Sequence, residues 1–476
     1  MAVSLELNSA AIAADLNLNA AVTAGLRISS WHQAVASPVY GGQPGPVKET
    51  MDLMVESTTH NLLAGHIQAL DSYRVQADAY MRDRTATDPV WLEAKMDGET
   101  GTRRAMVMSI NEGYRLPLYA LHDGPPQFTT MIRLEIWRMP WWEDPAHIHG
   151  TAATPSAAAQ VAYDHTAGAG GDVLGDVPAR LDSLLVIPQH ENTDIIGRLW
   201  MGFRSENKHS SLASFAPVWE CEDGTNGTDA ADGADATASG GNRVRVTPGT
   251  ATWAKRMSIT MLQATGALGA VDDNYGLFVW LLRAQVSAGT YEVQLRFGDV
   301  GMADDDHVRG PIVEVTNTSW DFTNQGTYTL PIVDRQIITT AAAVVSLDQT
   351  SNVQIWARRT DGAGTLDLDC LCPVPADEGF LFSDGYTLTY TDADTYDVWL
   401  FAESPQGTTQ AATYNHQLAN GWWTSVLAPS VQNFRPPVGD GRLYIVYARA
   451  GSSVITDTIN VEAIRFERWA SLRGAE

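Results

Sequence analysis

The chain has 476 residues, of which 44% are hydrophobic, so it can bury a core in each of about three domains. Its formal charge is −25, from 56 acidic and 31 basic residues. Because nucleic-acid binding depends on Lys and Arg against phosphate, we expect no stable binding to DNA or RNA. An alternative explanation for the acidic charge is that it keeps the protein dispersed in solution.

The three cysteines are Cys221, Cys370 and Cys372. Their number and spacing exclude a disulfide framework or a zinc knuckle, so we predict small buried apolar residues. The N-terminal segment MAVSLELNSA has no basic or apolar region of the kind found in signal peptides. No run of about 18 apolar residues occurs, so we expect no membrane insertion.

Residues 1–149 are predicted to form an α+β unit. Period-two alternation at 4–7 and 16–18 indicates strands, and further strands are predicted at 51–55 and 131–137. From Thr59 to about Met81, apolar residues recur at helical spacing, and a threonine is available as the N-cap. A single amphipathic helix among strands should cover one face of a sheet.

The rest of the chain is predicted to be mainly β. Residues 150–177 are rich in Ala, Gly, Thr and Ser, which is typical of a linker or arm. Short strands with turn signals in 178–377 indicate a jelly-roll β-sandwich of the galectin or carbohydrate-binding-module kind. Residues 378–476 are a further β region, either a separate domain or the completion of the barrel or the sandwich.

No catalytic motif stands out. The chain contains no G-x-S-x-G elbow, H-E-x-x-H helix, Walker loop or G-x-G-x-x-G after a strand. Its carboxylates are too numerous for two of them to be singled out as the acid and base of a glycosidase. We therefore expect a protein that is not an enzyme.

Two acidic turns contain hard oxygen ligands of the kind that hold calcium between loops, namely Asp272 with Asp273 and Asp304 with Asp305. Neither turn fits the EF-hand pattern, and a solvated acidic turn is the alternative. We expect no cofactor, with a structural calcium ion as the open alternative.

Several tryptophans could stack on sugar rings, since a flat ring supplies a large contact area. They are Trp253, Trp280, Trp320, Trp356, Trp422 and Trp423. Trp280 and Trp356 lie in strongly apolar strands, so we predict that both are core residues. Trp422 and Trp423 follow an Asn-Gly pair and are the candidates for carbohydrate binding, with core packing as the alternative.

Together these segments resemble phage tail-tip proteins of the distal tail (Dit-like) or minor tail protein kind. The resemblance lies in the strand at 51–55, the helix at 61–80, the sequence PVWL at 89–92 and the sequence RMPWWE at 138–143. GDVPA at 175–179 is similar to the entry of a jelly roll in such proteins, and DCLCPVPADE at 369–378 to its exit. The chain is longer than a minimal member of that family.

The resemblance implies a tube-like β-barrel with one helix in residues 1–149, which serves oligomerisation in a ring, commonly of six copies. The helix residues Leu63, Ile67, Leu70 and Tyr73 are the candidates for the contact between copies. The implied partners are the tail tube, hub and fibre proteins, and a glycan on the host surface. The implied location is the tail tip of the virion, after assembly in the host cytoplasm, where an acidic bore would let DNA pass.

Two further hypotheses stay open. The chain could be a carbohydrate-binding β-sandwich protein of the adhesin kind, with residues 178–377 as the binding module. The least favoured hypothesis is an enzyme that depolymerises a glycan.

Overall fold

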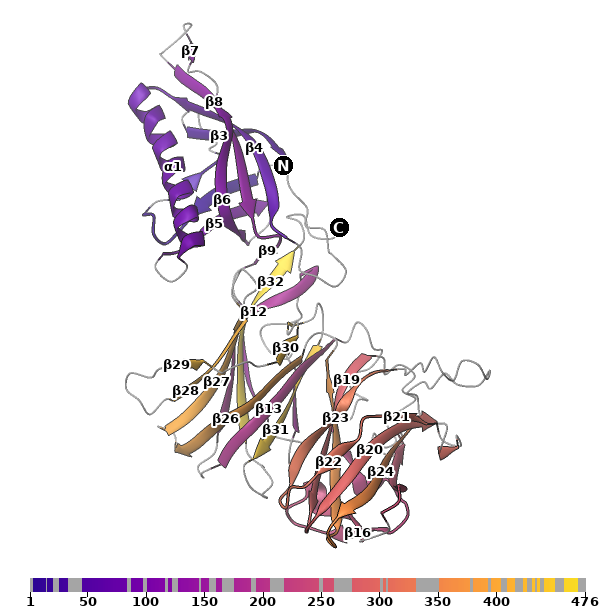
Figure 1. Ribbon diagram of the computed structural model, residues 1–476. Helices are drawn as coiled ribbons and strands as arrows, with labels where there is room; N and C mark the ends of the chain where they lie inside the picture. The colour runs from indigo at the N-terminus through magenta and orange to yellow at the C-terminus, as the bar shows by residue number, and fades with distance from the viewer. Residues whose placement is uncertain are drawn as a thin grey trace.

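A computed structural model gives the structure of the chain. It describes residues 3–13, 15–19, 25–32, 45–83, 87–96, 101–115, 119–121, 127–144, 147–153, 160–164, 175–189, 194–205, 218–247, 251–260, 276–299, 303–304, 307–330, 351–376, 380–392, 395–403, 409–415, 423–425, 430–432, 435–436, 441–449 and 458–469. The protein is mainly β, with antiparallel sheets and, within these ranges, a single α-helix. Its three units follow one another in space: a helix-covered unit, a central unit and a β-sandwich (Figure 1).

The first unit is a curved sheet in the order β2–β1–β5–β6–β8–β4–β3. Two short strands, β7 and β9, pair with β8 and β6. The strands are β1 (Val3–Asn8), β2 (Leu16–Asn17), β3 (Gly25–His32), β4 (Val47–Ser57), β5 (Val90–Met96), β6 (Arg103–Arg115), β7 (Tyr119–Leu121), β8 (Gln127–Arg138) and β9 (Trp142–Glu143).

The helix α1 (His60–Arg82) lies against this sheet (Figure 1). Thr59 has an extended backbone and accepts a hydrogen bond from the Leu62 amide at 3.2 Å, as an N-cap does. Leu63, Leu70 and Tyr73 are buried in the core shared with the strands. The predicted helix and its place on a sheet are confirmed. No helix among the described residues is long and apolar enough to cross a membrane.

The central unit consists of two sets of strands. One runs β28–β27–β12–β32–β10, and the other runs β11–β31–β13–β26–β30. The β26–β27 hairpin connects them, and β29 extends the first set. The strands are β10 (His147–Ala153), β11 (Gln160–Asp164), β12 (Val177–Gln189), β13 (Asp194–Ser205), β26 (Phe380–Asp392), β27 (Thr395–Glu403), β28 (Thr409–Asn415), β29 (Trp423–Ser425), β30 (Ser430–Gln432), β31 (Gly441–Arg449) and β32 (Thr458–Trp469).

This pairing differs from the ranges expected from the sequence. β11 and the second half of β10 lie in 150–177, where a linker was predicted, yet both strands pair with strands near the C-terminus. β12 and β13 lie in 178–377 but also pair with C-terminal strands, so the sandwich strands begin later, at Trp219. Short-range patterns do not encode which distant strand a segment pairs with.

The sandwich contains two sheets. The inner sheet runs β16–β17–β25–β19–β23, with β14 also on β25, and the outer sheet runs β15–β18–β24–β20–β21, with β22 also on β20. The strands are β14 (Trp219–Glu220), β15 (Thr225–Asn226), β16 (Ala230–Ala234), β17 (Asn242–Val246), β18 (Ala254–Thr260), β19 (Gly276–Val286), β20 (Thr290–Asp299), β21 (Val308–Arg309), β22 (Val313–Val315), β23 (Asp321–Leu330), β24 (Ser351–Asp361) and β25 (Leu366–Pro375). Their facing side chains form one core, with Trp280 stacked edge-on against Trp219 and Phe297.

The sandwich is inserted between two adjacent strands of the central unit. Gly202 in β13 is the register partner of Phe380 in β26, so the chain leaves and re-enters the central unit at neighbouring positions. The sandwich also rests on that unit, because β23 and β25 contact β13 and β31. Trp200 and Val446 share an apolar cluster with Phe322, Cys370 and Cys372 of the inner sheet. The three cysteines are free and buried, as predicted.

Candidate functional site

The outer sheet presents the broad face of the sandwich that no further sheet covers within the described residues. The inner sheet lies between the outer sheet and β13 and β31, and all ten residues of β25 are buried. A ligand that docks on a sheet of this unit therefore meets the outer sheet. In Figure 1 its strands β20, β21 and β24 lie on the side away from the central unit.

Strand alternation decides which residues point outward from the outer sheet. Val353, Ile355 and Ala357 of β24, and Val293, Leu295 and Phe297 of β20, are fully buried in the core. Their neighbours must therefore lie on the opposite surface. We call this side of the sheet the tryptophan face; its members are Trp253, Lys255, Glu292, Gln294, Arg296, Gln354, Trp356 and Arg358, of which Gln294, Arg296 and Gln354 are themselves buried.

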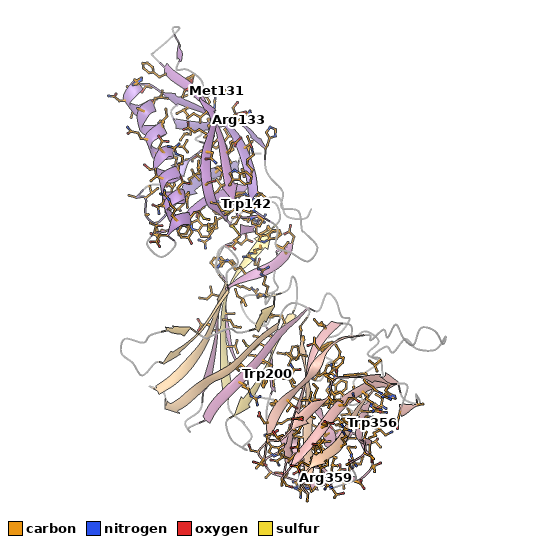
Figure 2. All side chains as sticks on the ribbon, in the orientation of Figure 1. Met131, Arg133, Trp142, Trp200, Trp356 and Arg359 are labelled. Carbon is orange, nitrogen blue, oxygen red and sulfur yellow. The ribbon has the colours of Figure 1, made fainter. Side chains whose placement is uncertain are left out.

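Trp356 lies on strand β24 of the outer sheet (Figure 2). Its indole Nε1 donates a hydrogen bond to the Gln354 side-chain oxygen at 2.7 Å, which fixes the rotation of the ring. The Arg296 guanidinium carbon lies 3.6 Å from the ring centroid, and Arg296 is only 4% exposed. Because Arg296 covers one side of a ring that is partly exposed, the exposed area belongs to the other side and the edges.

A second tryptophan lies diagonally across from Trp356. Trp253 precedes β18 and has Arg358 over its ring, with 5.1 Å between the guanidinium carbon and the centroid. Arg358 donates to Glu292 at 2.5 Å, so its position is set by a charged neighbour. Diagonal neighbours on adjacent strands lie about 7–8 Å apart at Cα, which is within the reach of one extended ligand.

Residues 303–304 and 307–310 border the tryptophan face. Asp304 accepts hydrogen bonds from Lys255 at 3.1 Å and from Gln354 at 2.8 Å. Burial alone would raise the pKa of Asp304, but these hydrogen bonds and the Lys255 charge lower it, so the carboxylate stays charged. The buried His307 ring lies on Gly298, where any Cβ would be 2.5 Å from its Nε2.

These contacts describe a flat surface with polar edges. Two partly exposed rings supply apolar area, while the partly exposed Lys255, Arg358 and Asp304 can exchange hydrogen bonds with a ligand that carries many hydroxyl groups. Several of these groups are pre-positioned by one another, which lowers the ordering cost of binding.

A separate cluster of carboxyl groups lies at the border of the inner sheet. Potential ligand atoms of Glu220, Asp369 and Cys370 all lie within 4.8 Å of one another. Asp369 accepts from the Ser239 amide at 2.8 Å and pairs with Arg283, while Glu220 accepts from the Ser239 hydroxyl at 2.5 Å. One oxygen of Glu220 and one of Glu222 are buried without a hydrogen-bond partner.

Burial sets the protonation of this cluster. It raises the pKa of Glu220 to about 8, with Asp369 and Glu222 adding repulsion and Ser239 offsetting part of the rise. It also raises the pKa of Glu222 to about 7 and that of Asp369 to about 6, the latter against the opposing charge of Arg283. Carboxylate oxygens are ligands that calcium prefers, so a cation could neutralise the cluster in place of protons.

The calcium candidates from the sequence do not form a cluster in the described structure. Asp272, Asp273 and Asp305 lie outside the described residues. Asp304 is described, but it is occupied by Lys255 and Gln354. The acidic run at 220–223 and the Asp369 side chain, brought together by β14 and β25, were not singled out, because their proximity depends on strand pairing.

The structure places the other predicted site residues as follows. Trp422 lies outside the described residues, and of Trp423 only the backbone, in β29, is described. Leu63, Leu70 and Tyr73 are 1–2% exposed, so they pack inside their own subunit and cannot form the predicted contact surface between copies. Ile67 is partly buried against the same core.

Trp280 is a core residue, as predicted, but the prediction that Trp356 is also core is wrong. Trp356 lies among apolar residues in the sequence, yet strand alternation places it on the side of the sheet away from the core, as it does Gln354 and Arg358. Side chains alternate between the two faces of a strand, so the apolar residues Val353, Ile355 and Ala357 predict that Trp356 points away from the core.

Comparisons with known proteins bear on the fold alone. No family model and no curated protein matches the chain. A carbohydrate-binding module, TmCBM61 in complex with β-1,4-galactotriose, is similar at 11% identity and a TM-score of 0.19, over 36% of this chain and 97% of that one. The CBM22-1–CBM22-2 tandem domain of Paenibacillus barcinonensis Xyn10C is similar at 12% identity and a TM-score of 0.23, over 54% and 99%. A structure of infectious bursal disease virus, Gx strain, is similar at 7% identity and a TM-score of 0.16, over 69% and 81%.

Proposed function

We propose that this protein binds carbohydrate without cleaving it, through the tryptophan face of its inserted sandwich. The observation that carries the proposal is the pair Trp253 and Trp356. Both rings are partly exposed on one sheet face, and each has an arginine over it. Sugar rings present apolar C–H faces and a rim of hydroxyl groups, which match this combination of flat rings and polar edges.

The position of the face supports the same function. The opposite side of the sandwich packs against Trp200 and Val446 of the central unit. The tryptophan face therefore points away from the central unit. A pre-formed surface lowers the ordering cost of binding.

Binding to a panel of polysaccharides by the full-length protein tests this function. Trp356→Ala and Trp253→Ala are each expected to weaken binding about tenfold or more, which corresponds to about 1.4 kcal/mol. Trp137→Ala is the matched control, since Trp137 is 39% exposed on the first unit and should not affect binding. Unchanged affinity in both sandwich variants would contradict the proposal, as would release of reducing sugar by the pure protein.

A second candidate function is that of a structural component of a phage tail tip, in which a ring of copies displays the sandwich. The observation that favours it is the joint between the first and central units, where β32 pairs with β9, β10 and β12 at once. One strand therefore joins the helix-covered unit to the unit that carries the sandwich. A protein that transmits force between its parts needs such a connection.

Negative-stain images of the purified protein test the structural function. Closed rings with a central hole would support it, and the copy number could then be counted. Monodisperse single copies at micromolar concentration would leave only the binding function. The exposed helix residues Leu62 and Val75, which are 55% and 61% exposed, are the positions to probe for ring contacts.

A further inference from the structure

Arg358 and Glu292 form an ion pair beside both tryptophans of the tryptophan face. They are register partners on the adjacent strands β24 and β20, and Arg358 Nε donates to Glu292 Oε2 at 2.5 Å. Trp356 lies two residues before Arg358 on β24. The Arg358 guanidinium also lies over the Trp253 ring. A ligand that touches both rings therefore passes over this ion pair.

The Trp356 ring is held from the end opposite to this pair. Arg296, which lies over the ring, and Gln354, which accepts from the indole Nε1, are register partners of each other. Along the two strands, Arg358 and Glu292 follow Trp356 in the other direction. Diagonal neighbours on adjacent strands lie within reach of a large side chain or ligand. A sugar ring on the exposed part of Trp356 is therefore within reach of Arg358 and Glu292.

Both members of the pair keep groups that can bind a hydroxyl. Within the described residues, the only side-chain hydrogen bond of Arg358 and Glu292 is the one that they share. The two Nη groups of Arg358 are therefore available as donors, and Oε1 of Glu292 as an acceptor. The two side chains are 37% and 18% exposed, so a ligand can reach them. A donor beside an acceptor matches two neighbouring hydroxyl groups, of which one accepts and the other donates.

The charges around the pair favour a neutral ligand. Glu314 of β22 is the register partner of Glu292 and is exposed. It forms no ion pair in the part of the chain that the structure describes. Because like charges directly opposite each other repel, a uronate or sulfate group here would add a third negative charge to an unfavourable pair. The protein around it has a formal charge of −25.

We propose that the ligand of the tryptophan face is a neutral polysaccharide with free vicinal hydroxyl groups. Arg358 and Glu292 bind two such hydroxyls, on neighbouring ring carbons of the sugar that stacks on Trp356. This inference rests on the proposed carbohydrate-binding function; it names the class of glycan and the residues that select it. A sugar without the vicinal pair would leave one of these polar groups without a partner, which weakens binding.

Chains of one sugar with two different linkages provide the matched test. Internal residues of a β-1,4-glucan carry free hydroxyls at carbons 2 and 3, whereas in a β-1,3-glucan the oxygen of carbon 3 is part of the linkage. The same holds for the two linkage types of galactan and of xylan. Calorimetry with the full-length protein would compare long soluble fragments of these six polymers and polygalacturonate, which has the hydroxyl pair but is charged.

We expect at least one 1,4-linked neutral chain to bind about tenfold more tightly than its 1,3-linked counterpart and than polygalacturonate. Its affinity should change by less than about twofold between about 50 and about 500 mM NaCl, because a neutral ligand gains little from screened charges.

Variants assign this preference to residues. Arg358→Lys and Glu292→Gln are each expected to weaken binding of the 1,4-linked chain about three- to tenfold and to remove its advantage over the 1,3-linked chain. Trp356→Ala should weaken binding of both chains about equally. Arg245→Lys is the control: it makes the same change on the inner sheet, where Arg245 donates to Asp367 at 2.8 and 2.9 Å, and should leave affinity unchanged.

The outcomes separate the two proposals. If Arg358→Lys weakens binding of both linkage types by the same factor, Arg358 only positions the Trp253 ring, and the proposed selection is overturned. Binding of polygalacturonate as tightly as the best neutral chain overturns the neutral ligand. Both results leave carbohydrate binding standing, whereas absence of binding to every polysaccharide removes the proposed function itself.

Discussion

Three carboxyl groups at the border of the inner sheet hold protons at pH values where carboxyl groups in water have lost them. Burial raises the pKa of Glu220 to about 8, of Glu222 to about 7 and of Asp369 to about 6. Unfolding returns these groups to their ordinary values near 4. Between about pH 4.5 and 8, the folded protein therefore binds more protons than the unfolded chain.

From this difference, the sandwich is expected to lose stability as the pH rises from about 4.5 to about 8, because stability falls where the folded state binds more protons. Glu220→Gln should flatten this dependence and raise Tm at pH 8. Thermal unfolding at several pH values measures both. A Tm that rises with CaCl2 at pH 8 only in the unmutated protein would show that this cluster binds calcium.

The glycine at 298 offers a second test at the scale of one residue. A Cβ there would be 2.5 Å from His307 Nε2, so Gly298→Ala must displace the buried ring and the segment that carries it. We expect a loss of about 1–3 kcal/mol in the free energy of unfolding, measured with urea. Gly233→Ala, where a Cβ meets nothing within 4 Å, is the control and should be close to neutral.

At the scale of elements, β32 holds the first unit to the central unit through buried charges. Glu143 of β9 pairs with Arg180 at 2.8 Å and with Arg468 of β32 at 3.2 Å, and all three are 1–4% exposed. Burial alone would raise the pKa of Glu143, but the two arginines lower it. The joint therefore keeps its charge above the ordinary pKa of glutamate and weakens in acid.

Glu143→Gln should destabilise this joint strongly, since it leaves two buried guanidinium groups facing a neutral amide. We expect a loss of about 3–5 kcal/mol in the free energy of unfolding of the first unit. Thermal or urea unfolding would measure it. Glu135→Gln removes an exposed pair with Lys48 and should change stability by no more than about 1 kcal/mol. Equal effects of the two substitutions would show that the joint contributes no more than a surface pair.

The sequence predicts single elements well where the signal is local. The helix follows from a capping threonine and an apolar spacing that match α1 to within a residue or two. Strand alternation predicts β20, where Tyr291, Val293, Leu295 and Phe297 are all buried. Pairing is not local: Arg180 and Arg468 meet Glu143 from positions far apart in the chain, so the joint and the carboxylate cluster escape a sequence-based prediction.

At the scale of the whole molecule, the insertion of the sandwich predicts that it can be removed. Replacing residues 206–378 by a short Gly-Ser turn should preserve the helix-covered unit, because Gly202 and Phe380 already lie side by side. The replacement should abolish the proposed glycan binding. It should also expose Trp200 and Val446, detectable as increased binding of an apolar dye. Hydrogen exchange that is unchanged in α1 would confirm that the first unit is independent; global unfolding would contradict it.

The layer between the inner sheet and β13 has a mechanical consequence. When a polymer held on the tryptophan face is pulled, the force reaches the central unit through packed side chains such as Trp200 against Phe322, with 5.8 Å between their ring centroids. The Arg198–Asp321 ion pair lies beside this contact. Tension along the sheets must then shear a broad apolar layer rather than peel strands apart one hydrogen bond at a time.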